Sequence, residues 1–202
     1  VASCYQNLYK NNTGHKDIRL ASVRAGNVIG GGDWSNDRLI PDIIRHMYEN
    51  KSLAIRNLGA VRPWQHVLEP LSGYLSLAQN LLLVGTADGE GFNFGPRAEQ
   101  NKTVTNLLTA MSHFWGNEIA AQPFTITDNI PFKEAGLLKL NCDKALFYLS
   151  WEATLDYNST VELTAQWYSA YYSENIDLFE FTNKQIEQYE VKALERESQW
   201  TK

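Results

Sequence analysis

The chain has 202 residues, of which 44% are hydrophobic and 20% are charged, and its formal net charge is −5. A chain of this length and composition can bury a sizeable core, which excludes a disordered tail, a collagen-like chain and a coiled coil. The slightly acidic balance gives no support to a general nucleic-acid binder, so any anionic ligand must be held by local positive charge.

Helical and strand-like patterns alternate along the chain, which predicts an α/β or α+β fold. The first residues, 1–11, have helical spacing but no capping residue before them, so we expect the chain to be the back part of a longer protein. Capping boxes at Ser159–Glu162 and Thr182–Gln185 predict the starts of the last two helices. The other expected strands are 18–24, 53–56, 61–67, 91–96 and 137–140, and the other expected helices are 38–48, 71–83, 103–115 and 143–149.

The apolar runs and the cysteines indicate in which cellular compartment the protein is expected. The longest apolar stretch, residues 80–84, has the length of a helix-core segment and falls far short of the roughly 18 residues of a membrane span. Cys4 and Cys142 lie far apart and form no Cys-x-x-Cys motif, so we expect two buried free thiols in a reducing compartment. We find no signal peptide, and we therefore expect a cytoplasmic protein.

The most informative segment, residues 24–34, is a strand pattern that ends in three consecutive glycines. The backbone at glycine can approach a ligand closely, and ligands of open α/β sheets bind beyond the carboxyl ends of strands. Asn27 would offer its amide there to a phosphate or a sugar hydroxyl. The alternative is a simple glycine turn with a structural asparagine. The segment is not a P-loop, because the Lys-Ser/Thr pair is absent.

A second candidate segment surrounds Arg62. The residue before Pro63 is held extended, and a guanidinium there could donate two parallel hydrogen bonds to a diphosphate. A lone arginine is more commonly part of a surface ion pair. Trp64 is more often a core residue than a platform for a base. His66 is more often a structural histidine than a ligand, and no second histidine or cysteine lies at metal-ligand spacing, so no metal site is expected.

Several acidic residues could be mistaken for a catalytic cluster. Loop solvation and the preference of a helix start for negative charge explain Asp33, Asp37 and Asp42. Glu69, which precedes Pro70, likewise suits a helix start. No nucleophile motif of the Gly-x-Ser-x-Gly type stands out.

Four runs of sequence carry a family resemblance. They are Arg-Ala-Gly-Asn-Val-Ile-Gly-Gly-Gly-Asp-Trp (24–34), Arg-Leu-Ile-Pro-Asp (38–42), Arg-Pro-Trp-Gln-His-Val-Leu-Glu-Pro-Leu-Ser-Gly-Tyr (62–74) and Phe-Asn-Phe-Gly-Pro (92–96). Together with the aromatic tail they resemble the CDP-glucose 4,6-dehydratases, a branch of the extended short-chain dehydrogenase/reductase family. The Arg-Pro-Trp-Gln-His run is specific, since other sugar-nucleotide enzymes more usually have Arg-Asp-Trp or Arg-Asp-Tyr there.

The resemblance implies an α/β fold with two parts. Residues 1–34 would be the last helix and strand of a truncated NAD-binding Rossmann domain, and residues 35–202 a C-terminal substrate-binding domain. In this family NAD oxidises C4 of CDP-glucose, water is lost across C5 and C6, and the hydride returns to C6. The product is a precursor of dideoxy sugars in bacterial surface polysaccharide such as lipopolysaccharide. The family also implies a homo-oligomer, and no nucleic-acid or membrane partner is expected.

The resemblance also implies roles for individual residues. Asn27 and Arg62 would hold the diphosphate, and Ala25 and Gly26 would be the cofactor-binding backbone beside the nicotinamide. The full set of implied substrate-binding residues is Asn27, Arg38, Leu39, Pro41, Ala54, Arg56, Arg62 and Asn93.

The catalytic motifs of the family are absent from this sequence. There is no Gly-x-x-Gly-x-x-Gly fingerprint, and no lysine follows a tyrosine by four residues. The general base and most of the NAD site would lie upstream of Val1, so we expect no catalytic residue and no turnover in this chain alone. Two alternatives stay open: a dehydratase or epimerase acting on another nucleotide sugar, and a truncated, non-catalytic binding module.

Overall fold

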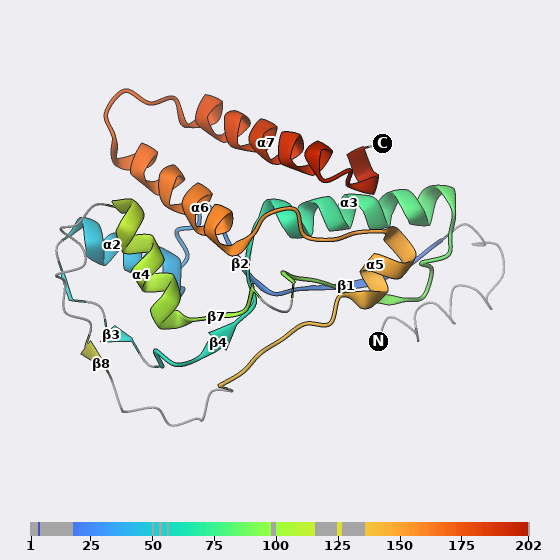
Figure 1. Ribbon diagram of the computed structural model, residues 1–202, viewed down its shortest axis with the longest axis horizontal. Coiled ribbons are helices and arrows are strands. Elements are labelled where there is room, and N and C mark those ends of the chain that lie inside the picture. Colours follow the sequence, from blue (N-terminus) through green and yellow to red (C-terminus); the bar gives the residue numbers. More distant parts are fainter. Residues whose placement is uncertain are drawn as a thin grey trace.

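The computed structural model describes Cys4 and residues 18–49, 51–52, 54–55, 57–97, 100–115, 125–126 and 136–201. Arg56 and all but Cys4 of the helix expected at 1–11 lie outside these residues. The elements, shown in Figure 1, are β1 (Ser22–Ala25), β2 (Asn27–Ile29), α2 (Leu39–Tyr48), β3 (Ala54–Ile55), β4 (Val61–Arg62), β5 (Trp64–His66), α3 (Leu68–Leu83), β6 (Gly91–Phe94), β7 (Lys102–Thr103), α4 (Val104–Trp115), β8 (Thr125–Ile126), α5 (Asp143–Leu149), α6 (Tyr157–Tyr172), α7 (Leu178–Glu195) and the short helix η2 (Gln199–Thr201). Helices and mostly parallel strand pairs alternate, so the fold class is α/β.

The strands pair two by two, and the chain changes partner at two bends. β1 pairs with β6 and β2 with β5, both in parallel, while β4 pairs with β7 in the antiparallel sense. Gly26 separates β1 from β2, and Pro63 separates β4 from β5. The backbone N–H of Asn27 donates to the carbonyl of Pro63 at 3.1 Å, which joins the two bends. The strand-like segment expected at 61–67, in which Pro63 and Trp64 suit an edge or a bend, divides at Pro63 because proline cannot donate to a sheet.

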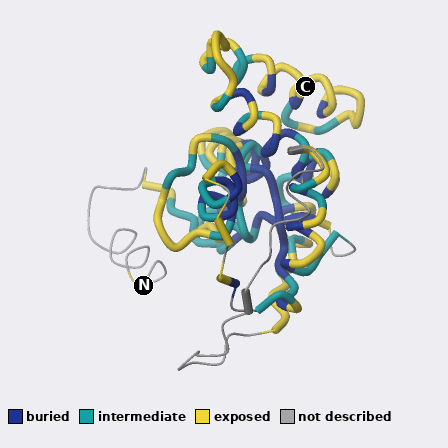
Figure 2. The backbone as a smooth tube through the Cα atoms, turned by 90° about the vertical axis from the view of Figure 1, so that its left-hand side faces the viewer, coloured by how far each residue is buried: buried dark blue, intermediate teal, exposed yellow. Residues whose placement is uncertain are grey.

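Two buried clusters flank these strands. One joins α2, α4 and α6 through side chains that include Ile43, Met111 and Tyr168. The other surrounds β6 and includes Phe94 and Trp151. Figure 2 shows the buried backbone running through the interior, with exposed backbone on the outer helices. The amphipathic patterns of α2, α4 and α6 are therefore confirmed as core faces.

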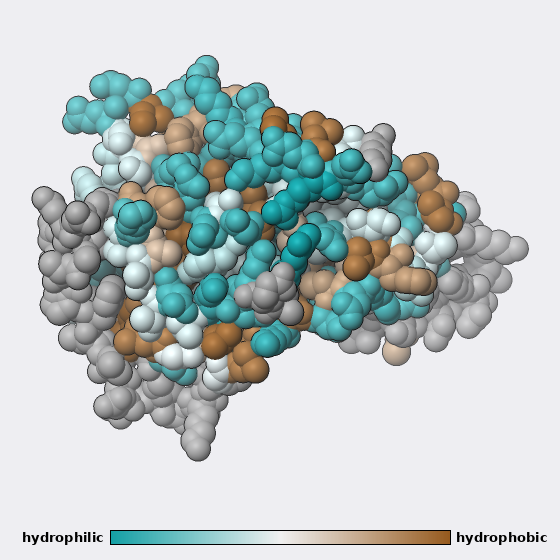
Figure 3. All heavy atoms as spheres, in the orientation of Figure 1, coloured by the Kyte–Doolittle hydropathy of each residue, from teal (hydrophilic) through white to brown (hydrophobic). Residues whose placement is uncertain are grey.

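The apolar run at the end of α3 is not in the core, contrary to the sequence prediction. Leu82, Leu83 and Val84 are 77%, 75% and 64% exposed. The last buried side chain of α3 is Leu77, and beyond it only Leu81 packs, partly buried, against the second cluster. Figure 3 shows apolar surface over this end of α3.

Both capping boxes were misplaced. Asp156 caps α6 by accepting the N–H of Ser159 at 2.7 Å, and Asp177 caps α7. The helices begin upstream of the predicted points because these aspartates already accept the free N–H groups of the first turn. Thr182 instead lies within α7, where its hydroxyl donates to the carbonyl of Leu178.

Two further expectations differ from the structure. The strand expected at 137–140 is a single bridge, in which Leu137 lies beside Val61. Both cysteines are free, as expected, but Cys4 is exposed and only Cys142 is partly buried. Burial raises the pKa of the Cys142 thiol.

Within the described ranges, no helix has the length and apolar character needed to cross a membrane. The same residues contain no group of three or more metal-ligating side chains.

A buried carboxylate fastens α3 to the C-terminal part of the chain. Glu69 is 1% exposed, and its oxygens accept the N–H groups of Thr154 and Leu155 at 2.9 and 2.6 Å. The hydroxyl of Tyr189 in α7 donates to the same carboxylate at 3.1 Å and lies 2.9 Å from the hydroxyl of Ser72. Burial raises the pKa of Glu69 to about 7, and the two backbone N–H groups oppose that rise.

We predict that Glu69 makes stability fall as the pH rises from about 4.5 to 7. Over that window the unfolded chain releases this proton before the folded chain does, which lowers the unfolding free energy by at most about 1.4 kcal/mol per pH unit. The Glu69→Gln variant lacks this titration. Urea unfolding of the unmodified chain and of Glu69→Gln at pH 5 and pH 7.5 measures how the unfolding free energy of each depends on pH. A stability difference between them that does not change with pH would contradict the raised pKa.

Candidate functional site

A cavity of about 860 Å³ lies beside the two bends where the strands change partner. Its walls come from the backbone of residues 25–30, the loop and first turn of α2, and the segments around β3 and β4. The carboxyl end of β2 opens onto it, which is where ligands bind in α/β folds.

Most of the residues singled out from the sequence line this cavity. They are Ala25, Gly26, Asn27, Arg38, Leu39, Pro41, Ala54 and Arg62. Arg56 lies outside the described residues. Asn93 does not line the cavity, and its side-chain amide donates to the carbonyl of Asn141 at 3.0 Å. It lies in β6 between the buried Phe92 and Phe94, so the alternation of the strand directs its side chain away from the face that those rings occupy.

Arg62 is a buried cation at the wall of the cavity. It is 7% exposed, which rules out the surface ion pair considered from the sequence. One of its nitrogens, Nη1, donates to the carbonyl of Val61 at 2.9 Å. A guanidinium in such a water-poor position favours an anionic ligand strongly, because a charge-assisted hydrogen bond is stronger there than in water.

The aromatic residues after Arg62 belong to the core, as expected. Trp64 is 5% exposed, and its indole N–H donates to the carbonyl of Lys102 at 3.1 Å, although part of it reaches the cavity. His66 is 3% exposed, and its Nδ1 accepts the N–H of Leu68 at 3.4 Å. Burial lowers the pKa of His66 to about 4, so it is a neutral structural histidine at pH 7.

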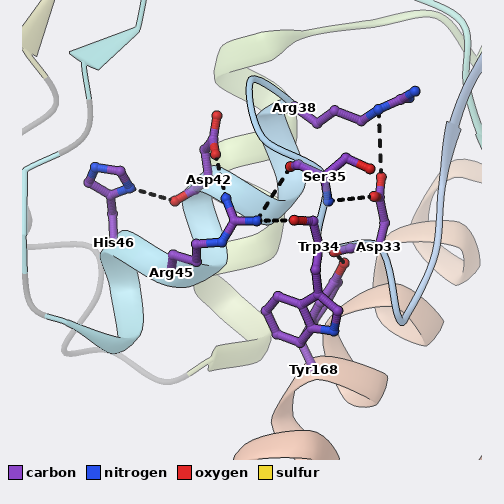
Figure 4. Close-up of polar contacts among 8 residues, drawn as sticks. All are labelled: Asp33, Trp34, Ser35, Arg38, Asp42, Arg45, His46 and Tyr168. Atoms are coloured by element: carbon purple, nitrogen blue, oxygen red, sulfur yellow. Dashed lines mark hydrogen bonds and ion pairs between the residues drawn. The ribbon is translucent and has the colours of Figure 1, made fainter.

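One wall of the cavity is a loop, residues 30–38, which we call the glycine loop. Asp33, Asn36, Asp37 and Arg38 of this loop line the cavity. The Asp33 carboxylate accepts the N–H of Ser35 at 3.0 Å and lies 4.0 Å from Nε of Arg38, as Figure 4 shows. Partial burial acts to raise the pKa of Asp33, but the Ser35 hydrogen bonds and then the charges of Arg38 and Arg45 bring it below its usual value.

The acidic residues lie where the sequence predicts, with Asp42 in the first turn of α2 and Asp33 and Asp37 in the loop before it. Asp33, Asp37 and Asp42 all line the cavity. Asp42 is paired with Arg45, three residues later in α2, at 2.9 Å. That spacing is visible in the sequence and could have indicated a paired acid. The other residues that sequence reasoning missed, such as Asn57 and Leu138, come from separate segments and carry no local signal.

The glycine loop fits closely against α6. A Cβ atom at Gly31 would overlap the ring of Trp167, so only glycine fits at that position. The hydroxyl of Tyr168 donates to the carbonyl of Asp33 at 2.8 Å. Upstream of the glycine loop, between β1 and β2, a Cβ atom at Gly26 would lie 2.8 Å from the carbonyl of Pro63. Both glycines therefore serve close packing within the protein itself.

The cavity has the chemistry of a binding site. An asparagine amide and two guanidinium groups, from Asn27, Arg38 and Arg62, suit a polar anionic ligand, and apolar side chains such as Leu39 and Pro41 suit its less polar parts. Among the described residues that line it there is no histidine, cysteine, serine, tyrosine or lysine to act as general base or nucleophile. The two glycines that line the cavity, Gly26 and Gly30, pack against Pro63 and Val67, so they form no cradle for a whole dinucleotide.

The fold is that of nucleotide-sugar epimerases and dehydratases. The structure matches UDP-glucuronic acid 4-epimerase of Bacillus cereus, solved with NAD, with a TM-score of 0.66 and 18% identity over 84% of this chain and 49% of that one. It matches dTDP-glucose 4,6-dehydratase of Bacillus anthracis, also solved with NAD, with a TM-score of 0.63 and 21% identity over 83% and 48%. It matches UDP-glucose 4-epimerase of Thermotoga maritima with a TM-score of 0.66 and 17% identity over 85% and 52%. No family model matches the sequence.

Sequence comparison gives a more specific relative. The chain is 46% identical to CDP-glucose 4,6-dehydratase of Salmonella typhimurium over 173 residues, which are 85% of this chain and 47% of that protein. The resemblance predicted from the four sequence runs is thereby confirmed. The chain spans about half the length of the relatives that it matches.

We predict that Gly31→Ala destabilises the chain, because the added methyl group forces apart the glycine loop and the Trp167 ring. Overpacking of this kind costs about 1–3 kcal/mol. Gly59→Ala is the matched control, since the nearest atom to its Cβ would be 3.7 Å away. Urea unfolding measures both. Equal stability of the two variants would show that the loop moves away from α6 without cost.

Proposed function

We propose that this chain is the C-terminal, nucleotide-sugar-binding portion of an NAD-dependent CDP-glucose 4,6-dehydratase, a lyase, and that its cavity binds CDP-glucose. The observation that carries the proposal is that Asn27 and Arg62, from β2 and β4, line one cavity. The 46% identity with CDP-glucose 4,6-dehydratase supports the same substrate class. The named solved relatives, two of them bound to UDP-sugars, support a nucleotide sugar in general.

In this proposal the diphosphate is the anchor. Arg62 donates to the phosphate oxygens, and the Asn27 amide, from β2, donates to them as well. Arg38, Leu39 and Pro41 cover the nucleotide, Ala54 and Arg56 flank the base and ribose, and Ala25 and Gly26 lie beside the nicotinamide. Binding energy from this remote part of the substrate then orients the hexose at the reacting centre.

The chemistry itself belongs to residues outside this chain. NAD would supply the hydride chemistry when bound, and both most of its site and the general base would lie in the part of the enzyme that this chain does not span. We propose accordingly that the chain alone binds substrate without turnover, with residues 1–34 as the end of the Rossmann domain and 35–202 as the substrate domain. We also propose a cytoplasmic homo-oligomer that acts in bacterial polysaccharide synthesis.

A panel of nucleotide sugars tests the function. Isothermal titration of the 202-residue chain with CDP-, UDP-, dTDP- and GDP-glucose is expected to show the tightest binding for CDP-glucose. Tighter binding of UDP- or dTDP-glucose would favour the second candidate, an epimerase or dehydratase for another nucleotide, which the UDP-sugar complexes of the solved relatives support. Binding of none of the four would refute the proposal.

Substitution of Arg62 tests the anchor. Arg62→Ala is expected to weaken CDP-glucose binding by on the order of 2–5 kcal/mol, because a desolvated charge pair is lost. Arg62→Lys keeps the charge and packing better but loses the two-pronged geometry, so it should weaken binding as well. Arg97→Ala is the control, since Arg97 pairs with Glu152 on the surface. An unchanged dissociation constant in both folded Arg62 variants would contradict the assignment.

A further inference from the structure

The glycine loop has little stiffness of its own. Residues 30–38 form no helix or strand before α2 begins, and Gly30, Gly31 and Gly32 are consecutive. Gly32 and Asp37 both have positive φ angles, of 78° and 59°. Such a segment has many conformations available, so contacts from outside must select the one that forms the cavity wall.

The first such contact comes from α2. Nη2 of Arg45 donates to the carbonyl of Trp34 and lies 3.4 Å from the carbonyl of Ser35. Nη1 of the same guanidinium donates to the Asp42 carboxylate at 2.9 Å, which fixes the direction of the fork. Figure 4 shows Arg45 between the helix and the loop backbone.

The second contact comes from α6. Tyr168 is fully buried, and its hydroxyl donates to the carbonyl of Asp33 at 2.8 Å. Its ring meets the ring of Trp34 edge to face, with centroids 5.3 Å apart. Burial raises the pKa of Tyr168, so the hydroxyl keeps its proton and remains a donor throughout the neutral range.

Both contacts are made to backbone carbonyls of the loop, so the side chains of Asp33 and Arg38 can line the cavity. Asp33, whose carbonyl Tyr168 holds, carries the carboxylate that lies 4.0 Å from Nε of Arg38. Arg38 is itself 64% exposed, so little else restrains it. Its place at the cavity therefore depends on where the backbone of Asp33 lies.

We propose that Tyr168 and Arg45 are positioning residues, which set the place of Arg38 in the cavity through the backbone of Asp33 and Trp34. This rests on the proposed function, in which Arg38 contacts the nucleotide. α6 thus contributes to ligand affinity although none of its residues lines the cavity.

The test compares two matched tyrosine variants of the 202-residue chain. Tyr168→Phe removes the hydroxyl and keeps the ring. Tyr171→Phe is the control, because that ring also lies against Trp34, at 4.7 Å, but is 45% exposed. Calorimetry should show that Tyr168→Phe weakens CDP-glucose binding roughly three- to tenfold, as for the loss of one buried hydrogen bond. Tyr171→Phe should leave the affinity unchanged, and Arg45→Lys should behave like Tyr168→Phe.

A double-mutant cycle distinguishes positioning from a general structural role. In an Arg38→Ala background, Tyr168→Phe should have no further effect on affinity, because both changes remove the same contact. An equal loss in both backgrounds would overturn the proposal, and so would a lowered melting temperature of Tyr168→Phe with unchanged affinity.

Hydrogen exchange of the free chain separates this proposal from the proposed function. Amides of residues 33–38 should exchange faster in Tyr168→Phe than in Tyr171→Phe. If the unmodified chain bound no CDP-glucose, the proposed function would fail, and the exchange data alone would decide whether Tyr168 holds the loop. Equal exchange in the two variants would then overturn the positioning role.

Discussion

The site depends on the parallel pairing of β2 with β5, in which Asn27 lies beside Trp64. This pairing brings together two segments that each change strand partner, at Gly26 and at Pro63. The backbone N–H of Asn27 donates to the Pro63 carbonyl and joins the two bends. Only glycine at position 26 allows the bends to approach so closely, because a Cβ atom there would meet the same carbonyl. Asn27 begins β2 and Arg62 ends β4, so each adjoins one of the bends, and both line the cavity. That they share one cavity depends on the pairing of distant strands and not on their separation in the sequence.

A continuous set of polar contacts connects this cavity to the C-terminal helices. Glu69 fastens α3, which follows directly after β5, to Tyr189 of α7. Gln185 of α7 donates to the carbonyl of Leu163 in α6 at 2.8 Å, and Tyr168 of α6 holds the glycine loop. The first two of these contacts are buried and the third is partly buried, so each is stronger than it would be at the surface and more costly to break. The last two long helices, α6 and α7, are therefore linked by hydrogen bonds to the elements that form the cavity.

Local patterns were sufficient to predict the parts of the fold that depend on local interactions. The helix at 143–149 was predicted with its observed bounds, and α2 to within one residue, because the period of their apolar residues reflects their own packing. The starts of α6 and α7 were missed because Asp156 and Asp177 compete with the later capping boxes. Which side of a strand faces the cavity depends on its distant partner, and so the place of Asn93 was not accessible from the sequence.

The proposed diphosphate site lies in an acidic chain, so the balance of charge within the cavity matters for the proposal. Three aspartates line the same space as Arg38 and Arg62, and their combined field alone would repel a diphosphate. Arg45 compensates Asp42 from outside the cavity, and Nε of Arg38 lies 4.0 Å from the Asp33 carboxylate and offsets part of its charge. In the proposed complex, Arg62, buried beside the bend, would meet the diphosphate at short range and low dielectric, where its attraction exceeds that of more distant, solvated charges. The proposal therefore depends on local geometry and not on the net charge of the chain.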